Sequence, residues 1–163
     1  KNNRLNCQNN LTKIHLKDLN LNNGEMKEIK VGPTDKESIL IVKHNGKLHA
    51  LSNYCPHFGA PMSTGVLIDN VIKCPWHGAS FDIISGQCDI GPSIDGLNKY
   101  DILEENGELY AMVDMSTIKK GKKADMAKRD PTNETHFVIL GGGPASLSAA
   151  ETLRSTGFTV GFI

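Results

Sequence analysis

The amino-acid sequence predicts an all-β domain of antiparallel hairpins, followed by the beginning of a parallel α/β domain. Three observations support this fold class. Short runs of alternating or β-branched residues recur from Leu11 to Val113, separated by Gly, Pro and Asn. Two Asn-Gly pairs, at 45–46 and 106–107, lie between such runs. From His136 onward an apolar run, a glycine-rich turn, an Ala- and Leu-rich stretch and a second apolar run follow in order.

The β region contains six runs that we expect to form strands. Each run is apolar, β-branched or alternating in character, which suits a half-buried strand. The runs are residues 11–16, 25–31, 38–43, 48–51, 100–103 and 109–113. Both central residues of a type I′ turn need positive φ, so each Asn-Gly pair predicts a tight two-residue hairpin. No stretch of helix length with a 3.6-residue period occurs in this region.

Two segments lie outside the predicted domains. Residues 1–10 are rich in Asn and are expected to be a disordered N-terminal tail. Residues 114–135 contain six Lys and Arg residues, four acidic residues and few large apolar ones. This composition favours an exposed linker between a domain at 11–113 and a second one at 136–163, the alternative being that the lysines form an interaction patch.

The C-terminal segment has the pattern of one βαβ unit. Residues 137–140 predict a short buried strand, 145–155 a helix and 158–163 a second strand. A strand, a turn, a helix and a strand in this order open a parallel α/β domain of the Rossmann type. Residues 136–163 are too few for a whole domain of that kind, so we expect a truncated one.

Charge and composition restrict the function classes. Eighteen Lys and Arg balance eighteen Asp and Glu, which argues against nucleic-acid binding because that role needs a basic face. No apolar stretch approaches the roughly 18 residues of a membrane span. Four cysteines are too few for a disulfide scaffold. Because the chain begins with Lys1 and not Met, we expect a fragment, whose lack of a leader segment says nothing about its compartment.

Two Cys-His pairs form the strongest motif. Cys55-x-His57 is followed, after sixteen residues, by Cys74-x-x-His77. Thiolates select zinc or iron–sulfur, and imidazole suits zinc and iron. Three interpretations are open: cysteines and histidines without a metal, a structural zinc site and an iron–sulfur centre. Zinc sites usually contain Cys-x₂₋₄-Cys pairs, whereas each half here supplies one Cys and one His, which favours a two-iron cluster.

Residues 55–60 and 74–82 resemble the Rieske [2Fe–2S] signature, and the resemblance covers residues 11–113. It implies the all-β Rieske iron–sulfur fold, in which stacked antiparallel sheets carry the cluster on two loops at one tip. It also implies the metal ligands, which divide between the two irons. One iron is held by Cys55 and Cys74, and the other by His57 and His77.

Four positions distinguish the chain from respiratory-chain Rieske proteins. Those proteins have an additional Cys in each loop, joined by a disulfide, where this chain has Ala60 and Trp76. They also place a Ser and a Tyr, which donate hydrogen bonds at the cluster, where this chain has Ala79 and Phe81. Hydrogen bonds to sulfur stabilise the reduced cluster. The resemblance is therefore to ferredoxin-type and oxygenase-type domains, with a potential of roughly −150 mV.

The second motif is a dinucleotide fingerprint. Its candidate cofactor-binding residues are Gly141, Gly143, Pro144, Ala145 and Ser146. The first glycine allows a tight turn, and the second lets a pyrophosphate approach the backbone at the helix N-terminus. Ser146 stands where the fingerprint has its third small residue. The alternative is an ordinary glycine-rich turn, and the acidic ribose partner would lie at or beyond the end of the chain.

A Rieske-like domain, a basic linker and this fingerprint together resemble the apoptosis-inducing-factor-like proteins, family member three. The resemblance implies an FAD-dependent NAD(P)H oxidoreductase in the full-length protein, with electrons leaving singly through the [2Fe–2S] cluster. It also implies an intracellular location, mitochondrial or cytoplasmic, and leaves the electron acceptor unknown. Two alternatives are a stand-alone Rieske ferredoxin serving a separate oxygenase or nitrite reductase, and a zinc-stabilised binding scaffold.

Overall fold

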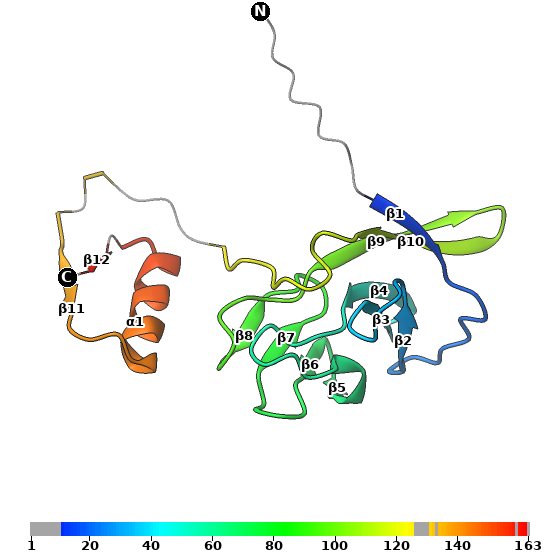
Figure 1. The fold of residues 1–163 in the computed structure, drawn as a ribbon, viewed down its shortest axis with the longest axis horizontal. Coiled ribbons are helices and arrows are strands. Elements are labelled where there is room, and N and C mark those ends of the chain that lie inside the picture. Colours follow the sequence, from blue (N-terminus) through cyan, green and yellow to red (C-terminus); the bar gives the residue numbers. More distant parts are fainter. Residues whose placement is uncertain (1–10, 126–130, 133, 159, 163) are drawn as a thin grey trace, which may run out of the picture. The chain divides into compact units, whose positions relative to one another are not determined.

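The structure is a computed structural model, shown in Figure 1. It describes residues 11–125, 131–132, 134–158 and 160–162. The chain divides into two compact units, one ending at Lys122 and the other beginning at Lys123. The expected tail at 1–10, and the part of the expected linker at 126–130, lie outside the described residues. No helix in the described part of the chain is long and apolar enough to cross a membrane.

The first unit contains two antiparallel sheets, as the predicted fold class requires. The larger sheet has six strands in the order β1-β10-β9-β4-β3-β2. Its strands are β1 (Leu11–His15), β2 (Met26–Lys30), β3 (Ser38–His44), β4 (Lys47–Ser52), β9 (Lys99–Glu105) and β10 (Glu108–Asp114). All six expected strands are therefore confirmed, with small differences at their ends.

The smaller sheet was not assigned from the sequence. It has four strands of three residues each, in the order β5-β6-β7-β8. They are β5 (Val66–Ile68), β6 (Val71–Lys73), β7 (Ser80–Asp82) and β8 (Cys88–Ile90), preceded by the 3₁₀ helix η1 (Met62–Thr64). Figure 1 shows these strands gathered beside β2, β3 and β4.

Both Asn-Gly hairpins form as expected. The φ angles are 50° and 73° at residues 45–46, and 53° and 81° at 106–107. The flanking strands pair directly on either side of each turn, which leaves two-residue loops. Positive φ at both central residues is the signature of the type I′ turn, whose twist matches that of the strands.

Strand β3 divides the apolar interior into two clusters. Its residues 39–42 are all fully buried, and successive side chains point to opposite faces of the sheet. Leu40 and Val42 belong to the cluster that also holds Cys55 and Cys74. Ile39 and Ile41 belong to the other, with β1, β9 and β10. Burying an aliphatic side chain of this size contributes about 1.5–3 kcal/mol, so the two thiols lie in a part of the unit that apolar burial stabilises.

Residues 115–122, here called the strap, follow β10 and pack against the first unit. The sequence placed them in an exposed linker, but Ile118 is only 3% exposed and lies in the second apolar cluster. At the end of the strap the backbone N–H groups of Gly96 and Lys122 each donate to the other's carbonyl, at 2.7 and 2.8 Å. The buried Ile118, this backbone bridge and the amide of Asn98, which donates to the carbonyls of Thr117 and Lys120, hold the segment against the unit.

The second unit has the expected order of strand, turn, helix and strand. Strand β11 (Phe137–Ile139) pairs in parallel with β12 (Val160–Phe162), and helix α1 (Pro144–Ser155) connects them. Parallel strands need a crossover connection, which the helix supplies. The described residues thus form one βαβ unit.

Candidate metal centre

Loop 1, residues 55–60, follows β4 and closes on itself through two backbone hydrogen bonds. The N–H of Gly59 donates to the carbonyl of Cys55 at 2.7 Å, and the N–H of Cys55 donates to the carbonyl of Ala60 at 2.9 Å. Gly59 has a φ of 76°, in the left-handed region that L side chains rarely adopt. The loop is therefore a tight turn whose glycine has a conformational role.

Loop 2, residues 74–79, joins β6 to β7 and repeats this turn. The N–H of Gly78 donates to the carbonyl of Cys74 at 3.1 Å, and the N–H of Cys74 to the carbonyl of Ala79 at 2.8 Å. The φ of Gly78 is 75°, almost that of its counterpart in loop 1. The two halves of the sequence motif thus share one backbone geometry.

The histidines hold different positions within these matched turns. His57 is the second residue after the cysteine of loop 1, and His77 is the third after that of loop 2. Aromatic residues, Trp76 and Phe58, stand in the two positions that remain. The imidazole rings of the two histidines nevertheless meet, with centroids 4.9 Å apart and planes at 84°. The one-residue offset therefore brings one ring from each loop to the same place.

The two cysteines also meet, beneath the surface. Cys55 is 2% exposed, Cys74 is 5% exposed, and their thiols are within hydrogen-bonding contact. Burial raises the pKa of the Cys55 thiol to about 11, although the backbone N–H groups of His57 and Phe58 face its sulfur and act in the opposite sense. Two thiolates side by side in an apolar cluster need a neutralising cation, and N–H groups directed at sulfur are what an anionic iron–sulfur group requires.

A buried nitrogen supports the same interpretation. Nδ1 of His57 is buried and has no hydrogen-bond partner in the described structure. An unsatisfied buried polar atom costs about 1–3 kcal/mol, whereas a metal ion would satisfy it. The residues present therefore fit a metal group on chemical grounds.

The grouping of the side chains bears on whether the site suits one metal ion or a cluster of two. Among the described residues, no three His, Cys, Asp or Glu side chains are grouped so that they could surround one metal ion. A tetrahedral zinc site needs four such ligands at one ion. A two-iron cluster needs two ligands at each iron, and the thiols and the imidazoles here meet as two separate pairs.

Aromatic side chains border the histidines at the surface. The ring of Phe58 lies edge-on to His57, with centroids 4.4 Å apart, and 5.6 Å from the ring of His77. Trp76 lies 6.5 Å from His77, also edge-on. Phe58 is 69% exposed and Trp76 is 57% exposed. The imidazoles therefore lie at a surface that carries accessible apolar rings.

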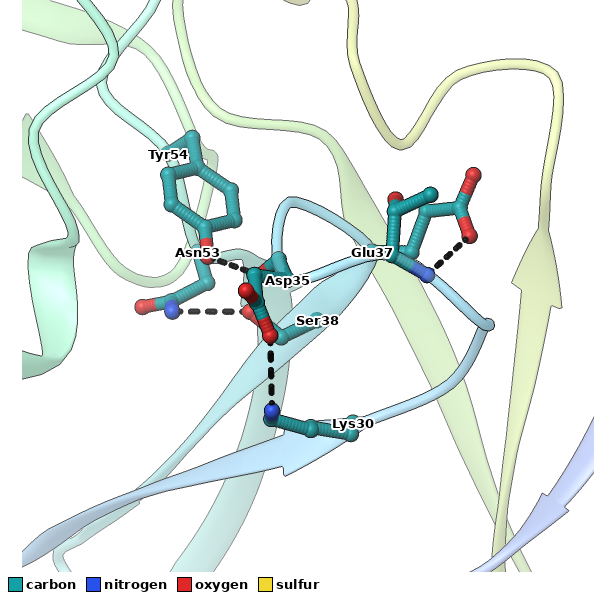
Figure 2. A network of polar contacts seen from close by, with 7 residues as sticks. Lys30, Asp35, Glu37, Ser38, Asn53 and Tyr54 are labelled. Atoms are coloured by element: carbon teal, nitrogen blue, oxygen red, sulfur yellow. Dashed lines mark hydrogen bonds and ion pairs between the residues drawn. The ribbon is translucent and has the colours of Figure 1, made fainter.

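A buried polar network supports loop 1 from behind, and Figure 2 shows part of it. Asn53 is fully buried two residues before the first cysteine. Its amide Nδ2 donates to Oγ of Ser38 at 2.9 Å, and its Oδ1 accepts from the backbone N–H of Ser63 at 2.9 Å. Its carbonyl accepts from the N–H of Met62 at 2.6 Å. Asn53 thus joins the base of loop 1 to β3 and to η1.

The next residue extends this support to the turn before β3. The hydroxyl of Tyr54 donates to the carbonyl of Asp35, as Figure 2 shows. The carboxylate of Asp35 pairs with Lys30 at 3.0 Å, and Thr34 donates its backbone N–H to Glu37 at 3.2 Å. The turn that faces loop 1 is therefore itself closed by side-chain hydrogen bonds.

Asp82 has the corresponding role behind loop 2. Its carboxylate accepts hydrogen bonds from the backbone N–H groups of Ile84 and Ser85 and from the amide of Asn70. Partial burial acts to raise its pKa, but these bonds outweigh it and hold the pKa below its ordinary value. The carboxylate thus stabilises the turn that follows β7.

The second unit places the predicted cofactor-binding residues at one turn. Gly141 has a φ of 101°, and Gly143 is the N-cap of α1, which begins with Pro144 and continues through Ala145 and Ser146. Among the described residues, no side chain forms a capping hydrogen bond at the N-terminus of the helix. A Cβ added at Gly143 would meet nothing within 4 Å, so the approach to the helix N-terminus is open. Uncapped N–H groups beside an open glycine turn fit a phosphate group.

The structure thus brings the four predicted ligands together in two pairs and places the glycine turn before α1, and it shows supporting residues that the sequence did not indicate. Asn53 and Asp82 had no sequence signal, because single Asn and Asp residues near turns are common. The only indirect signal was position, since each lies within a few residues of a ligand-bearing loop.

The family model for the Rieske [2Fe–2S] domain matches residues 12–101, which include both loops, the smaller sheet and strands β2, β3 and β4 of the larger one. The chain belongs to this family. It is a Rieske electron-transfer domain with the paired thiols and imidazoles described above. The Rieske fold expected from the sequence is confirmed.

Comparisons with individual proteins agree. The chain is 38% identical over 151 residues to apoptosis-inducing factor 3 of Homo sapiens, an alignment that covers 89% of this chain and 24% of that protein. This Rieske chain thus spans about a quarter of that relative's length. It is 33% identical over 76 residues to the 3-phenylpropionate/cinnamic acid dioxygenase ferredoxin subunit of Photorhabdus laumondii, which covers 46% of this chain and 72% of that protein.

A solved structure supports the fold. The ferredoxin of carbazole 1,9a-dioxygenase from Nocardioides aromaticivorans IC177 superposes with a TM-score of 0.51 at 24% identity. The superposition covers 62% of this chain and 95% of that ferredoxin. At this identity the similarity concerns the fold alone.

Proposed function

We propose that the chain transfers single electrons through a [2Fe–2S] cluster held by Cys55 and Cys74 at one iron and by His57 and His77 at the other. The observation that carries this proposal is the pairing of like with like: thiol meets thiol in the core, and imidazole meets imidazole at the surface. The cluster, when bound, supplies reversible one-electron chemistry.

The protein's own residues position and tune that group. The matched turns of the two loops hold the ligands, and backbone N–H groups face the sulfur of Cys55. Ala79 and Phe81 are fully buried at positions where a hydroxyl would otherwise donate to the cluster. Fewer hydrogen bonds to sulfur disfavour the reduced state, so we propose a potential low in the Rieske range, roughly −150 mV.

The fuller proposal is that a flavin domain supplies the electrons. In it, residues 136–163 begin an FAD-binding domain, and Gly141, Gly143, Pro144, Ala145 and Ser146 hold the FAD pyrophosphate at the N-terminus of α1. FAD, when bound, would accept a hydride, and with it a pair of electrons, from NAD(P)H. The positive φ of Gly141 and the uncapped helix support the proposal, as does the similarity to apoptosis-inducing factor 3 along both units.

The full-length protein tests this proposal. NADH or NADPH should bleach its flavin and then produce the EPR signal of a reduced Rieske cluster in the absence of air. Gly143→Val should remove the flavin, because a branched side chain would fill the approach to the helix N-terminus, and should leave the cluster signal after dithionite intact. A cluster that dithionite reduces and NAD(P)H does not would contradict the flavin coupling and favour a ferredoxin that serves a separate enzyme.

A further inference from the structure

A pocket of about 280 Å³ opens beside loop 1. Four segments line it: the turn before β3, loop 1 with Tyr54 before it, the loop that holds Asp95, and the strap. The strap contacts the loop closely, because a Cβ added at Gly121 would lie 2.8 Å from Cβ of Pro56 and 2.5 Å from Cβ of Asp95. With Ile118 buried beneath it, the strap holds its side chains at a fixed place relative to the ligand-bearing loop.

The charged groups of this pocket are mostly positive. Lys36, Lys119 and Lys120 line it, opposed by one carboxylate, Asp95. Nζ of Lys119 pairs with Glu37 at 2.7 Å, which fixes it at the pocket wall. Lys36 and Lys120 are exposed, and the described structure shows no ion pair for either. Two ammonium groups are therefore available at the pocket mouth for an external anion.

An apolar anchor lies between these lysines and the histidines. Phe58 lines the same pocket, is 69% exposed, and contacts the rings of both histidines. Exposed aromatic side chains surrounded by polar groups are frequent centres of protein–protein binding energy. The pocket thus combines an apolar centre with a basic border next to the site of electron transfer.

Building on the proposed electron transfer, we infer that the surface formed by Lys36, Phe58, Lys119 and Lys120, the lysine–phenylalanine face, docks the protein with which the cluster exchanges electrons. The partner's contact surface carries carboxylates that reach Lys36 and Lys120, and an apolar group that packs on Phe58. One electron passes between the partner and the cluster, from whichever of the two is reduced to the one that is oxidised, and no bond forms or breaks. Docking here brings the partner over loop 1 and the strap.

The test uses the 163-residue chain with its cluster and an acidic plant-type [2Fe–2S] ferredoxin as the probe. Plant-type ferredoxins have lower potentials than Rieske centres, so transfer to this chain is downhill. Calorimetry with both proteins oxidised measures Kd, and stopped-flow mixing with the reduced ferredoxin measures the rate. The double variant Lys36→Glu/Lys120→Glu is compared with Lys47→Glu, an exposed lysine at the opposite end of β4 from loop 1.

We expect the double variant to weaken binding and slow transfer by about tenfold or more at an ionic strength of about 0.01 M. The difference should shrink to about twofold at roughly 0.5 M, because salt screens exposed charges, and Lys47→Glu should stay within about twofold throughout. Phe58→Ser should weaken binding several-fold at both ionic strengths, since its contact is apolar. The variant Lys36→Gln/Lys120→Gln should bind and accept electrons at levels between those of the parent chain and the charge-reversed variant. It replaces the charge-reversed variant if charge reversal disturbs the loop.

An oxidant whose charge is opposite to that of the ferredoxin distinguishes a docking defect from damage to the cluster. Hexaammineruthenium(III), a cation, should oxidise the dithionite-reduced double variant as fast as the parent chain or faster. Equal slowing with the cation and with the acidic ferredoxin overturns the docking proposal, and so do equal effects of the double variant and Lys47→Glu. A parent chain with no Rieske EPR signal overturns the proposed function as well, so the two failures are distinguishable.

Discussion

The imidazole rings of His57 and His77 meet edge-to-face, with centroids 4.9 Å apart, although the two residues occupy different positions in otherwise matched turns. The cysteines occupy the same position in both turns, and their thiols meet in the core beneath. The histidines are offset by one residue between the loops and meet near the surface, whereas the cysteines are not offset and meet in the core. The two kinds of candidate ligand thus lie at two different depths. With the proposed ligand assignment, electrons would enter and leave on the imidazole side, while the buried thiol side stays away from water.

Cysteine substitution tests the ligand assignment. Cys55→Ser should lower bound iron by about tenfold or more, because a hydroxyl is a poor ligand for iron where a soft thiolate is needed. Cys88→Ser is the matched control, because Cys88 is half-buried outside both loops, and it should retain full iron. Iron content and the visible spectrum of the purified chains provide the measurement. Full iron in Cys55→Ser, or equal loss in Cys88→Ser, would be incompatible with the assignment.

The buried amide behind loop 1 should matter for stability. Asn53→Ala leaves Oγ of the fully buried Ser38 and the N–H of the half-buried Ser63 without their partner. We expect the free energy of unfolding to fall by about 2–3 kcal/mol, measured by denaturant titration. Asn20→Ala, at an exposed position, should change it by no more than about 0.5 kcal/mol. Equal effects of the two variants would remove the network from the account of the site.

The glycines of the two turns have space for a side chain, but their backbone conformation is one that L residues rarely adopt. A Cβ added at Gly59 or Gly78 would meet nothing within 4 Å, so the penalty for Ala is backbone strain alone, about 1–2 kcal/mol each. Asn adopts left-handed φ more readily, so Gly59→Asn should recover part of that loss. Denaturant unfolding of both variants measures the difference. Ala variants as stable as the parent chain would show that the turn can relax.

The buried position Ala79 should control the redox potential. A hydroxyl that donates to the cluster would stabilise its reduced form by about 1 kcal/mol, which corresponds to roughly 40 mV for one electron. Ala79→Ser should therefore raise the potential by tens of millivolts in an EPR-monitored redox titration. Ala111→Ser, fully buried in the other apolar cluster, controls for the general effect of a buried hydroxyl. A potential that is unchanged or lower in Ala79→Ser would argue against sulfur hydrogen bonding as the cause of the low value.

The lowered pKa of Asp82 predicts a pH dependence. Because the folded pKa lies below the ordinary value of 3.8, the carboxylate contributes stability above that pH, and the contribution is lost as the pH falls through the folded value. Asp82→Asn should thus be less stable than the parent by about 1–2 kcal/mol at neutral pH. This difference in the free energy of unfolding should be smaller at about pH 3 than at neutral pH. A difference that is constant between these pH values would exclude the charge of Asp82 as its origin.

The longer strands were predictable because they are long enough to show a pattern. Strand β3 is a continuous apolar run buried on both faces, Tyr100 and Ile102 alternate with polar residues in β9, and the Asn-Gly pairs at 45–46 and 106–107 mark the hairpins. Strands β5 to β8 have three residues each, too few to show a period. Their positions follow from pairing with one another and from packing on Leu40 and Val42, which are tertiary contacts.

In the site, too, some features could be predicted from the sequence and others depend on tertiary contacts. The candidate ligands could be proposed from the sequence because iron chemistry demands particular residue types at fixed spacing in each loop. The strap could not, because only the tertiary structure reveals that Ile118 is buried among residues from other strands. The same holds for Lys36 and Lys120, which are far apart in sequence and come together only because the strap crosses loop 1.

Pulsed EPR on the dithionite-reduced 163-residue chain, prepared with and without ¹⁵N-labelled histidine, tests the central claim most directly. The account predicts a Rieske-type signal with two strongly coupled histidine nitrogens, and loss of one of the two couplings or of the whole cluster in His57→Ala and in His77→Ala. A reduced iron–sulfur signal without histidine couplings would contradict the ligand assignment. A colourless chain that carries zinc and gives no signal would contradict electron transfer itself.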